Sequence, residues 1–525
     1  MVKRSVSVVS LLFASISAII GSGWLFSSYY AAICAGSASV LSWILGGLAI
    51  LIIAFVFGEI CSLLPITGFS ARVPQYTHGT VVGFIFSWII WLSYAAMTPT
   101  ETQAIIQYVS YYFPQLVHGD NALTKYGYIT ATFLMLLVSV INVYSLRWLI
   151  RSNNFLTVFK MVIPLFIAFV LLSGNFSIEN TFHPVDLPFA PFGLKGVFAA
   201  LSSGGIVFAF NGFKQAAEMA GETKKPHLAL PIALAGSIVI CLVIYLFLQV
   251  AFINSLQPDN LKYGWNNLML AASSSPLASV IAESHAEWLL PFLYSCAIIA
   301  PLAAAMMYCS SAGRSLYGMS KNRYVPFILQ KLNPHGNPGY AITANFFVGM
   351  LMFAPLPGWN NMVAFLSSLM AITYAIGPIS LLSLRKQAPD HPRLFRLPVA
   401  YIWSATAFYL CTLLIYWCGW HIVYMLDITI LVGLTVILVY QYISYLHKKP
   451  VELHWRASIW LLVYFSGLSL ISYLGSFGGG LSIISFGIDF IMLGIFSIFV
   501  IYLSLEFMLS PEKTRAYIKE LQAEI

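Results

Sequence analysis

The first part of the chain holds an apolar stretch far longer than a soluble domain would tolerate. No lysine, arginine, aspartate or glutamate occurs from Ser5 to Gly58. A membrane span needs about 20 consecutive apolar residues, so this stretch is long enough for two spans joined by a tight turn. Over all 525 residues, 59% are hydrophobic and 8% are charged, whereas about 25% are charged in soluble domains. We therefore expect an all-α integral membrane protein in which no soluble domain is left over.

The basic residues at the start of the chain and the seven cysteines do not indicate a function. Lys3 and Arg4 ahead of an apolar stretch imitate a secretory signal peptide, but the apolar character continues past any plausible cleavage site. The seven cysteines lie inside apolar runs and none has CxxC spacing. We interpret them as buried small hydrophobic residues.

Basic residues indicate the topology rather than a nucleic-acid partner. Apolar runs predict about fourteen transmembrane helices, which begin near Val6, Ser37, Val81, Tyr126, Phe155, Gly196, Leu230, Trp288, Ala341, Met362, Tyr401, His421, Ser458 and Leu481. If the amino terminus is cytoplasmic, the outer loops keep only Lys125, Lys195 and Lys262 of the 26 basic residues, and Lys160 and Lys214 lie inside spans. This bias predicts that both ends are cytoplasmic.

The first predicted span is interrupted by Gly21-Ser22-Gly23. A spanning segment must satisfy its own backbone hydrogen bonds, so an interruption at mid-bilayer depth survives only where it faces protein or a water-filled cavity. Unwinding at two glycines would leave the Ser22 and Gly23 amides free to bind a carboxylate. The alternative is a packing motif in which small residues let another helix approach closely.

A second interruption lies in the sixth predicted span, from Gly204 to Lys214. The first and sixth spans occupy corresponding positions if spans one to five and six to ten are repeats. Paired interruptions of this kind are the best sequence indication of a transporter's binding site near the bilayer midplane. The packing alternative applies here as well.

Ionisable residues inside the predicted spans are candidates for function. Lys160 lies among apolar residues of the fifth span, where burial disfavours its charged form, so we expect it to exchange a proton; the alternative is snorkelling to the interface. Glu101, in an unusually polar part of the third span, is a candidate for the cavity. Glu59, near a span end, is expected to have a helix-packing or interfacial role, and Asp427 and Asp489 are expected to form structural pairs.

The sequence lacks the motifs of several enzyme classes. The chain has no GxxxxGK[ST] motif for nucleotide hydrolysis, no HExxH motif for a zinc site and no GxSxG motif for a serine hydrolase. We expect no enzyme activity, no metal site and no cofactor. A channel is disfavoured because no repeated filter sequence appears.

From Ser5 to about Arg396 the chain resembles the amino acid-polyamine-organocation (APC) superfamily of permeases. The resemblance depends on the Gly21-Ser22-Gly23 interruption, on Phe208 to Phe213 followed by Glu222 to Pro226, and on Gly313-Arg314-Ser315 followed by Asn322 to Pro326. It implies a LeuT-type fold: ten helices in a five-plus-five inverted repeat over residues 1–396. Residues 397–525 would then add four transmembrane helices and a short cytoplasmic tail.

The resemblance also implies the roles of individual residues. The Ser22 and Gly23 amides would bind the substrate carboxylate, and the carbonyls of Ile19, Phe208 and Asn211 would receive the amino group. Phe208 would be the outer aromatic gate. Gly21 and Ala209 would complete the binding site, and Tyr308 would line the pocket in the eighth span.

Lys160 matches a lysine that replaces a bound sodium ion in some proton-coupled members of the superfamily, so the resemblance implies the proton as coupling ion. Two positions depart from the family pattern. Lys214 stands where the family often has an acidic residue, which slightly favours an anionic substrate and makes Lys214 a candidate cavity or gate residue alongside Glu101. Gly68 to Arg72 replaces a Gly-Gly-x-Tyr motif, so the inner gate is expected to differ.

The leading hypothesis is a secondary active amino acid transporter of the plasma (inner) membrane that works by proton symport and alternating access. Its expected partners are a small amino acid substrate and the lipid bilayer, with no nucleic acid; the sequence gives no oligomeric state. An exchanger of amino acids or amines is the alternative transport mode. A non-transporting receptor or scaffold on the same fold is the alternative from another class.

Overall fold

The computed structural model describes residues 6–66, 69–144, 146–184, 187–446 and 452–524. Over these ranges the protein is helical, and two isolated β-bridges are the only strand-like pairs. Some residues named from the sequence lie outside the described ranges. They are Gly68 and four basic residues that contribute to the charge bias, Lys3, Arg4, Lys448 and Lys449. The helices are α1 (Val8–Ile19), α2 (Gly23–Ala35), α3 (Ser39–Leu63), α4 (Phe69–Val109), α5 (Lys125–Tyr144), α6 (Leu146–Asn175), α7 (Ile178–Phe182), α8 (Gly193–Ser202), α9 (Ile206–Ala209), α10 (Gln215–Glu218), α11 (Pro226–Asn254), α12 (Pro276–Glu283), α13 (Leu290–Lys321), α14 (Gly339–Met352), α15 (Gly358–Gln387), α16 (Ala400–Tyr416), α17 (Trp420–Leu446), α18 (Ile459–Leu474), α19 (Ile488–Glu506) and α20 (Pro511–Glu524).

Within the described ranges, ten helical segments are long and apolar enough to cross a membrane. One of them, Gly23–Leu63, joins α2 and α3 across a tight turn at Gly36, whose φ is 62°. Four further apolar helices, α1, α8, α14 and α16, are shorter. In a bilayer, helices satisfy their own backbone hydrogen bonds and need few polar partners, which explains why the apolar runs become helices. The chain is therefore a multi-pass membrane protein.

Most predicted helix starts lie within four residues of the observed ones, but α4 and α6 begin earlier, at Phe69 and Leu146 rather than near Val81 and Phe155, and one start near the carboxy-terminal end was wrong. Apolar residues from Leu481 suggested a span, but α19 begins at Ile488. The amides of Leu481, Ile483 and Ile484 instead donate to the carbonyls of Tyr473 and Leu474 at the end of α18. Because the loop's amides bond to the preceding helix, its apolar side chains do not require a helix.

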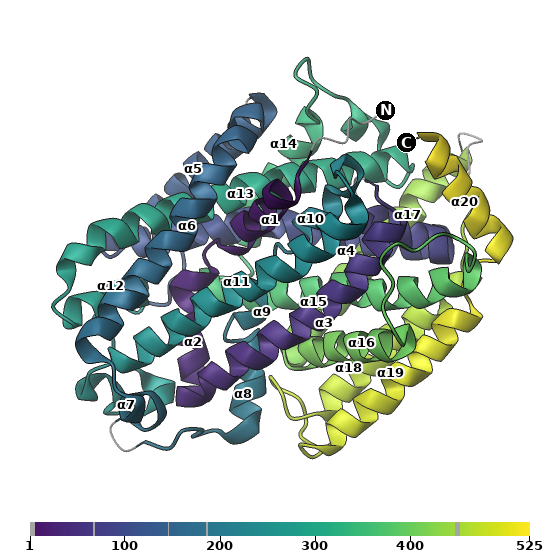
Figure 1. Ribbon diagram of the computed structural model, residues 1–525. Coiled ribbons are helices and arrows are strands. Elements are labelled where there is room, and N and C mark those ends of the chain that lie inside the picture. Colours follow the sequence, from purple (N-terminus) through teal and green to yellow (C-terminus); the bar gives the residue numbers. More distant parts are fainter. Residues whose placement is uncertain (1–5, 67–68, 145, 185–186, 447–451, 525) are drawn as a thin grey trace.

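Helices α4 and α15 form the centre of the molecule. In each of them 94% of the most apolar segment is buried inside the protein, compared with 28% for α5 and α17. Helix α4 bends at Gly79, whose φ of 80° interrupts the helix. Helices α16, α18 and α19 gather on one flank, where α16 contacts α3 and α15 (Figure 1). The interruptions of the first and sixth spans lie next to this central pair.

Candidate functional site

The first span is interrupted where the sequence predicted. Helix α1 ends at Ile19 and α2 begins at Gly23. The amide of Ile20 closes the last turn of α1 on the carbonyl of Ile16, and the Gly21 amide donates to the Ile19 carbonyl. The first amides of a helix have no partner inside it, so the amides at the start of α2 need acceptors from elsewhere in the protein.

Glu101 from α4 occupies the start of α2. Its Oε2 atom accepts a hydrogen bond of 2.8 Å from the Ser22 amide, and its side chain is buried. A Cβ on Gly21 would collide with the same carboxylate, which explains why position 21 has no side chain. The helix N-terminus favours a negative group here. The amide that the sequence assigned to a substrate carboxylate is therefore bound to a carboxylate of the chain itself.

The sixth span is interrupted twice. Gly205 (φ 76°) precedes the single turn of α9, and Gly212 (φ 112°) separates α9 from α10. A Cβ on Gly212 would meet the main chain of Ala18 and Ile19. A Cβ on Gly23 would lie 2.9 Å from Cα of Ala209. The two interruptions therefore pack directly against each other, and Gly23 also serves the close-packing role that was the alternative to a binding site.

Lys160 on α6 reaches the carboxy-terminal end of α1. Its Nζ atom donates to the Ser17 carbonyl at 2.8 Å and to Ser17 Oγ at 3.4 Å, and its side chain is fully buried. The last carbonyls of a helix carry partial negative charge and lack partners within it, so they suit a cation. This burial excludes snorkelling to the interface. An electrostatic interaction also links Lys160 to Glu101.

An aromatic layer, made by Phe26, Tyr30, Phe208 and Trp359, covers the interruption. The indole Nε1 of Trp359, at the start of α15, donates to Ser22 Oγ at 2.8 Å. Its ring meets Phe208 edge-on with centroids 5.5 Å apart and stacks on Phe26 at 4.6 Å and on Tyr30 at 5.7 Å. Phe208, the expected gate, thus belongs to this layer. Trp359 was missed, although Pro357-Gly358 before it is a recognisable helix start.

Two tyrosines that the sequence analysis also missed connect the interruptions. The hydroxyl of Tyr245 on α11 lies 3.0 Å from the Ala209 carbonyl and 3.2 Å from the Ile19 carbonyl. Tyr374 on α15 donates to Asn211 Oδ1 at 2.7 Å. A lone tyrosine in an apolar span is the only signal that sequence offers for such contacts, because a buried hydroxyl needs a partner.

The remaining predicted residues lie beside this centre. Tyr308 on α13 is buried, interacts electrostatically with Glu101, and its hydroxyl has no hydrogen-bond partner within the described part of the chain. Lys214, just before α10, is buried and bonds to Thr373 on α15. The structure thus brings Ile19, Gly21, Ser22, Gly23, Glu101, Phe208 and Ala209 together, with Lys160 at the end of α1 and Asn211, Lys214 and Tyr308 around them.

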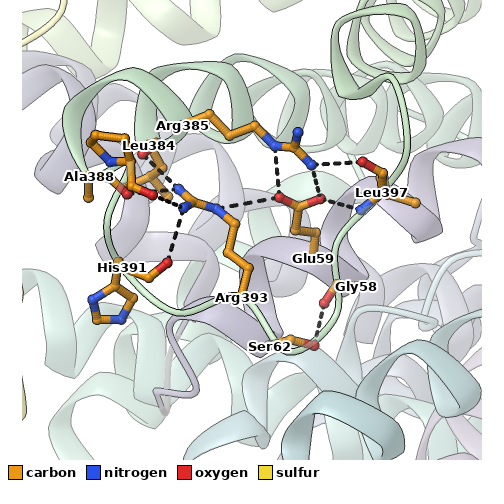
Figure 2. A network of polar contacts seen from close by, with 10 residues as sticks. Gly58, Glu59, Ser62, Leu384, Arg385, Ala388, His391, Arg393 and Leu397 are labelled. Atoms are coloured by element: carbon orange, nitrogen blue, oxygen red, sulfur yellow. Dashed lines mark hydrogen bonds and ion pairs between the residues drawn. The ribbon is translucent and has the colours of Figure 1, made fainter.

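Glu59 lies apart from this centre, in an ion network that Figure 2 shows. Its carboxylate accepts two hydrogen bonds from Arg385 at 2.9 and 2.7 Å and one from the Leu397 amide at 2.7 Å, while Arg393 lies 3.7 Å away. The network joins α3, the end of α15 and the loop that follows it. This geometry fits the helix-packing role expected for Glu59.

Comparison with known proteins identifies the family. Residues 6–419 match the amino acid permease family. The chain is 33% identical over 503 residues to a glutamate/serine transporter of Bacillus subtilis (strain 168), covering 94% of this chain and 92% of the relative. It is also 33% identical over 507 residues to an aspartate-proton symporter of the same organism, covering 95% and 96%. A branched-chain amino acid permease of that organism is 24% identical over 450 residues, covering 84% and 93%.

Both 33%-identical relatives align over nearly their whole length, and the family match spans the interrupted helices and the central pair. The chain therefore belongs to the amino acid permease family and is a multi-pass membrane transport protein.

Proposed function

We propose that this chain is a secondary active amino acid transporter that couples uptake to protons by alternating access. The names of the two relatives that are 33% identical, an aspartate-proton symporter and a glutamate/serine transporter, support an amino acid substrate, and the first of these names also supports a proton as the coupling ion. In this proposal the ten long segments and four shorter apolar helices form fourteen spans. The first ten would be the five-plus-five repeat, with four more spans after residue 396.

The contact between Glu101 and the Ser22 amide carries the proposal. A transporter that binds an amino acid at α2 needs a helix N-terminus that can bind a carboxylate. At the start of α2 the Ser22 amide already binds the Glu101 carboxylate, at 2.8 Å. The substrate carboxylate would replace Glu101 on the Ser22 and Gly23 amides. Its amino group would face the carbonyls of Ile19, Phe208 and Asn211.

Exchange of one carboxylate for another supplies a route to proton coupling. A Glu101 side chain that has left the Ser22 amide is an uncompensated buried anion, and neutralising it with a proton removes that cost. Lys160 would couple the protonation of Glu101 to the position of α1, because its ammonium group binds the Ser17 carbonyl. A lysine at this place also supplies the positive charge that a bound sodium ion would otherwise bring.

The orientation and membrane are part of the same proposal. Basic residues are concentrated on one side of the predicted spans, so both ends of the chain would be cytoplasmic. A carrier of this family in a bacterial cell would use the proton gradient of the plasma membrane.

Purified protein in proteoliposomes tests the proposal. With an imposed inward proton gradient, labelled aspartate, glutamate or serine should accumulate above its outside concentration, and a protonophore should abolish accumulation. Counterflow without net uptake would instead identify an exchanger. Binding of amino acids without any flux would identify a receptor and overturn the proposed transport.

A further inference from the structure

Lys214 is a buried cation without a paired carboxylate. Its side chain is 3% exposed and its Nζ atom donates to Thr373 Oγ1 at 2.7 Å. The same atom lies 4.8 Å from the ring centroid of Tyr374 and 5.7 Å from that of Phe57. Across the described ranges, no carboxylate oxygen lies within 4.0 Å of it. A hydroxyl and two aromatic faces do not neutralise a buried ammonium group, which calls for an anion.

The nearest acid along the chain is already engaged. Glu218 lies four residues after Lys214, one turn further along, and its Oε1 atom accepts from the Tyr94 hydroxyl at 3.2 Å. An electrostatic interaction connects it with Lys214, but no direct contact does. Glu218 thus lowers the cost of burying Lys214, and the ammonium group keeps two N–H donors besides the one that binds Thr373.

Two further buried donors around the site lack acceptors. Asn211 Nδ2 and the Tyr308 hydroxyl have no partner within the described part of the chain, and each residue is 1% exposed. Tyr374 links Asn211 to Lys214, because its hydroxyl donates to Asn211 Oδ1 while its ring lies under the ammonium group. Buried polar groups are normally hydrogen-bonded. A surplus of donors beside an unpaired cation is suited to an acceptor-rich anion.

The position of Lys214 relative to the Ser22 amide fits a molecule with two carboxylates. Ser15 Oγ donates to the Phe213 carbonyl at 3.1 Å, so the backbone before Lys214 lies beside Ser15 of α1. From Ser15, α1 continues for four residues to its end at Ile19, which is about 6 Å along the axis, and Ser22 follows in the interruption. The Lys214 ammonium group lies beside the ring of Tyr374, whose hydroxyl binds Asn211 in the same interruption. A ligand held at the start of α2 would therefore extend its far end toward Lys214.

We propose that Lys214 binds the side-chain carboxylate of the substrate, so that this transporter selects dicarboxylic amino acids over neutral ones. The inference rests on the proposed function and makes it more specific. The α-carboxylate would bind at the Ser22 amide, and Asn211 and Tyr308 would offer further donors between the two ends. The competing explanation is that Lys214 only balances the charge of Glu218 within the helix packing.

Paired substrates test the inference, because aspartate and asparagine, or glutamate and glutamine, have nearly the same shape and differ in the charge of one end. In proteoliposomes, the wild-type ratio of kcat/KM for aspartate to that for asparagine should be at least ten. In Lys214→Met this ratio should fall at least tenfold, since removing one partner of a buried charge pair is costly. Lys214→Arg should keep the preference for the acidic substrate. Lys262→Met, in an outer loop, is the matched control.

Each result decides between the explanations. An unchanged ratio in Lys214→Met, or equal loss for both substrates, overturns the role of Lys214 and leaves amino acid transport intact. If Lys214→Met does not fold, the wild-type protein still decides: asparagine that competes with labelled aspartate as strongly as unlabelled aspartate contradicts the inference. Wild-type protein that moves no amino acid at all contradicts the proposed function instead.

Discussion

Glu101 binds the backbone amide of Ser22 through its own carboxylate, at 2.8 Å. The two residues come from different helices, α4 and the start of α2, and Gly21 leaves the space that the carboxylate fills. The protein thus carries, within its candidate site, a group with the same chemistry as one end of an amino acid. Substrate and Glu101 cannot both occupy the Ser22 amide.

Replacement of Glu101 by glutamine should uncouple transport from protons. A carboxamide keeps the shape and can still accept from the Ser22 amide, but it does not exchange a proton between pH 5 and 8. We expect uptake driven by a proton gradient to fall at least tenfold while counterflow persists. Both are measured in the same proteoliposomes. Glu179→Gln, at an exposed position on α7, is the control, and full accumulation by Glu101→Gln would rule out a coupling role for Glu101.

Replacement of Lys160 by alanine should separate binding from accumulation. The variant loses the 2.8 Å bond to the Ser17 carbonyl, but no contact of the Ser22 amide. We expect thermal stabilisation by substrate to remain, because binding to the native state alone produces it. Accumulation against a gradient should be lost. Lys125→Ala in an exposed position provides the comparison, and normal gradient-driven uptake by Lys160→Ala would exclude its proton role.

The close contact of Gly23 with Ala209 should make even a methyl group harmful. A Cβ at position 23 would lie 2.9 Å from Cα and from Cβ of Ala209, and inserting atoms into a packed interior costs about 1–3 kcal/mol. We expect Gly23→Ala to lower the thermal midpoint and the transport rate. Gly318→Ala on α13 is the matched control and should not destabilise the protein. Nothing lies within 4 Å of its added Cβ, and alanine favours the helix. Equal midpoints for the two variants would contradict the packing argument.

The ion network around Glu59 predicts a loss of stability without any change in substrate preference. The Glu59 carboxylate is fully buried, and Arg385 and Arg393 have side chains 21% and 7% exposed. Breaking a buried ion pair by removing one partner costs about 3 kcal/mol or more. Glu59→Gln should therefore denature at lower detergent concentration in a dodecyl sulfate titration than the wild type. Glu520→Gln, exposed on α20, should match the wild type; if Glu59→Gln did so too, the network would be unimportant for stability.

Much of the helix layout could be predicted from sequence because it depends on local composition. Apolar runs, the glycines at 21 and 23 and the interrupted sixth span all appear in short windows of sequence. The start of α19 could not be predicted in this way, because the amides of Ile483 and Ile484 bond to a carbonyl of Leu474 rather than to their own helix.

The composition of the site depends on contacts between distant residues, which one sequence does not reveal. Trp359 lies 337 positions from Ser22, and Tyr245 lies 226 from Ile19. The residues next to each of them in sequence do not indicate which distant residue it contacts. Glu101 was a candidate only as a charge in an apolar span, and its partner became known only from the geometry.

His454, which lies shortly before α18, should make stability depend on pH. The Thr80 amide, just after the bend of α4, donates to Nδ1 of His454 at 3.4 Å, so this nitrogen must be unprotonated. Burial lowers the pKa of His454 below its usual value of 6.5, and the nearby Lys513 lowers it further, while Glu452 partly opposes the change. The folded protein therefore binds this proton less readily than the unfolded chain.

Stability should fall at low pH, because the unfolded chain binds the His454 proton more readily than the folded protein. The contribution of His454 is present in full above pH 6.5 and is lost as the pH falls below it toward the folded pKa. The thermal midpoint of full-length protein in detergent should drop between pH 8 and pH 5.5. His454→Asn can still accept from Thr80 but does not titrate, so its drop should be smaller. His118→Asn, in the exposed loop between α4 and α5, should keep the wild-type drop, and an equal drop in His454→Asn would mean that other groups set the pH dependence.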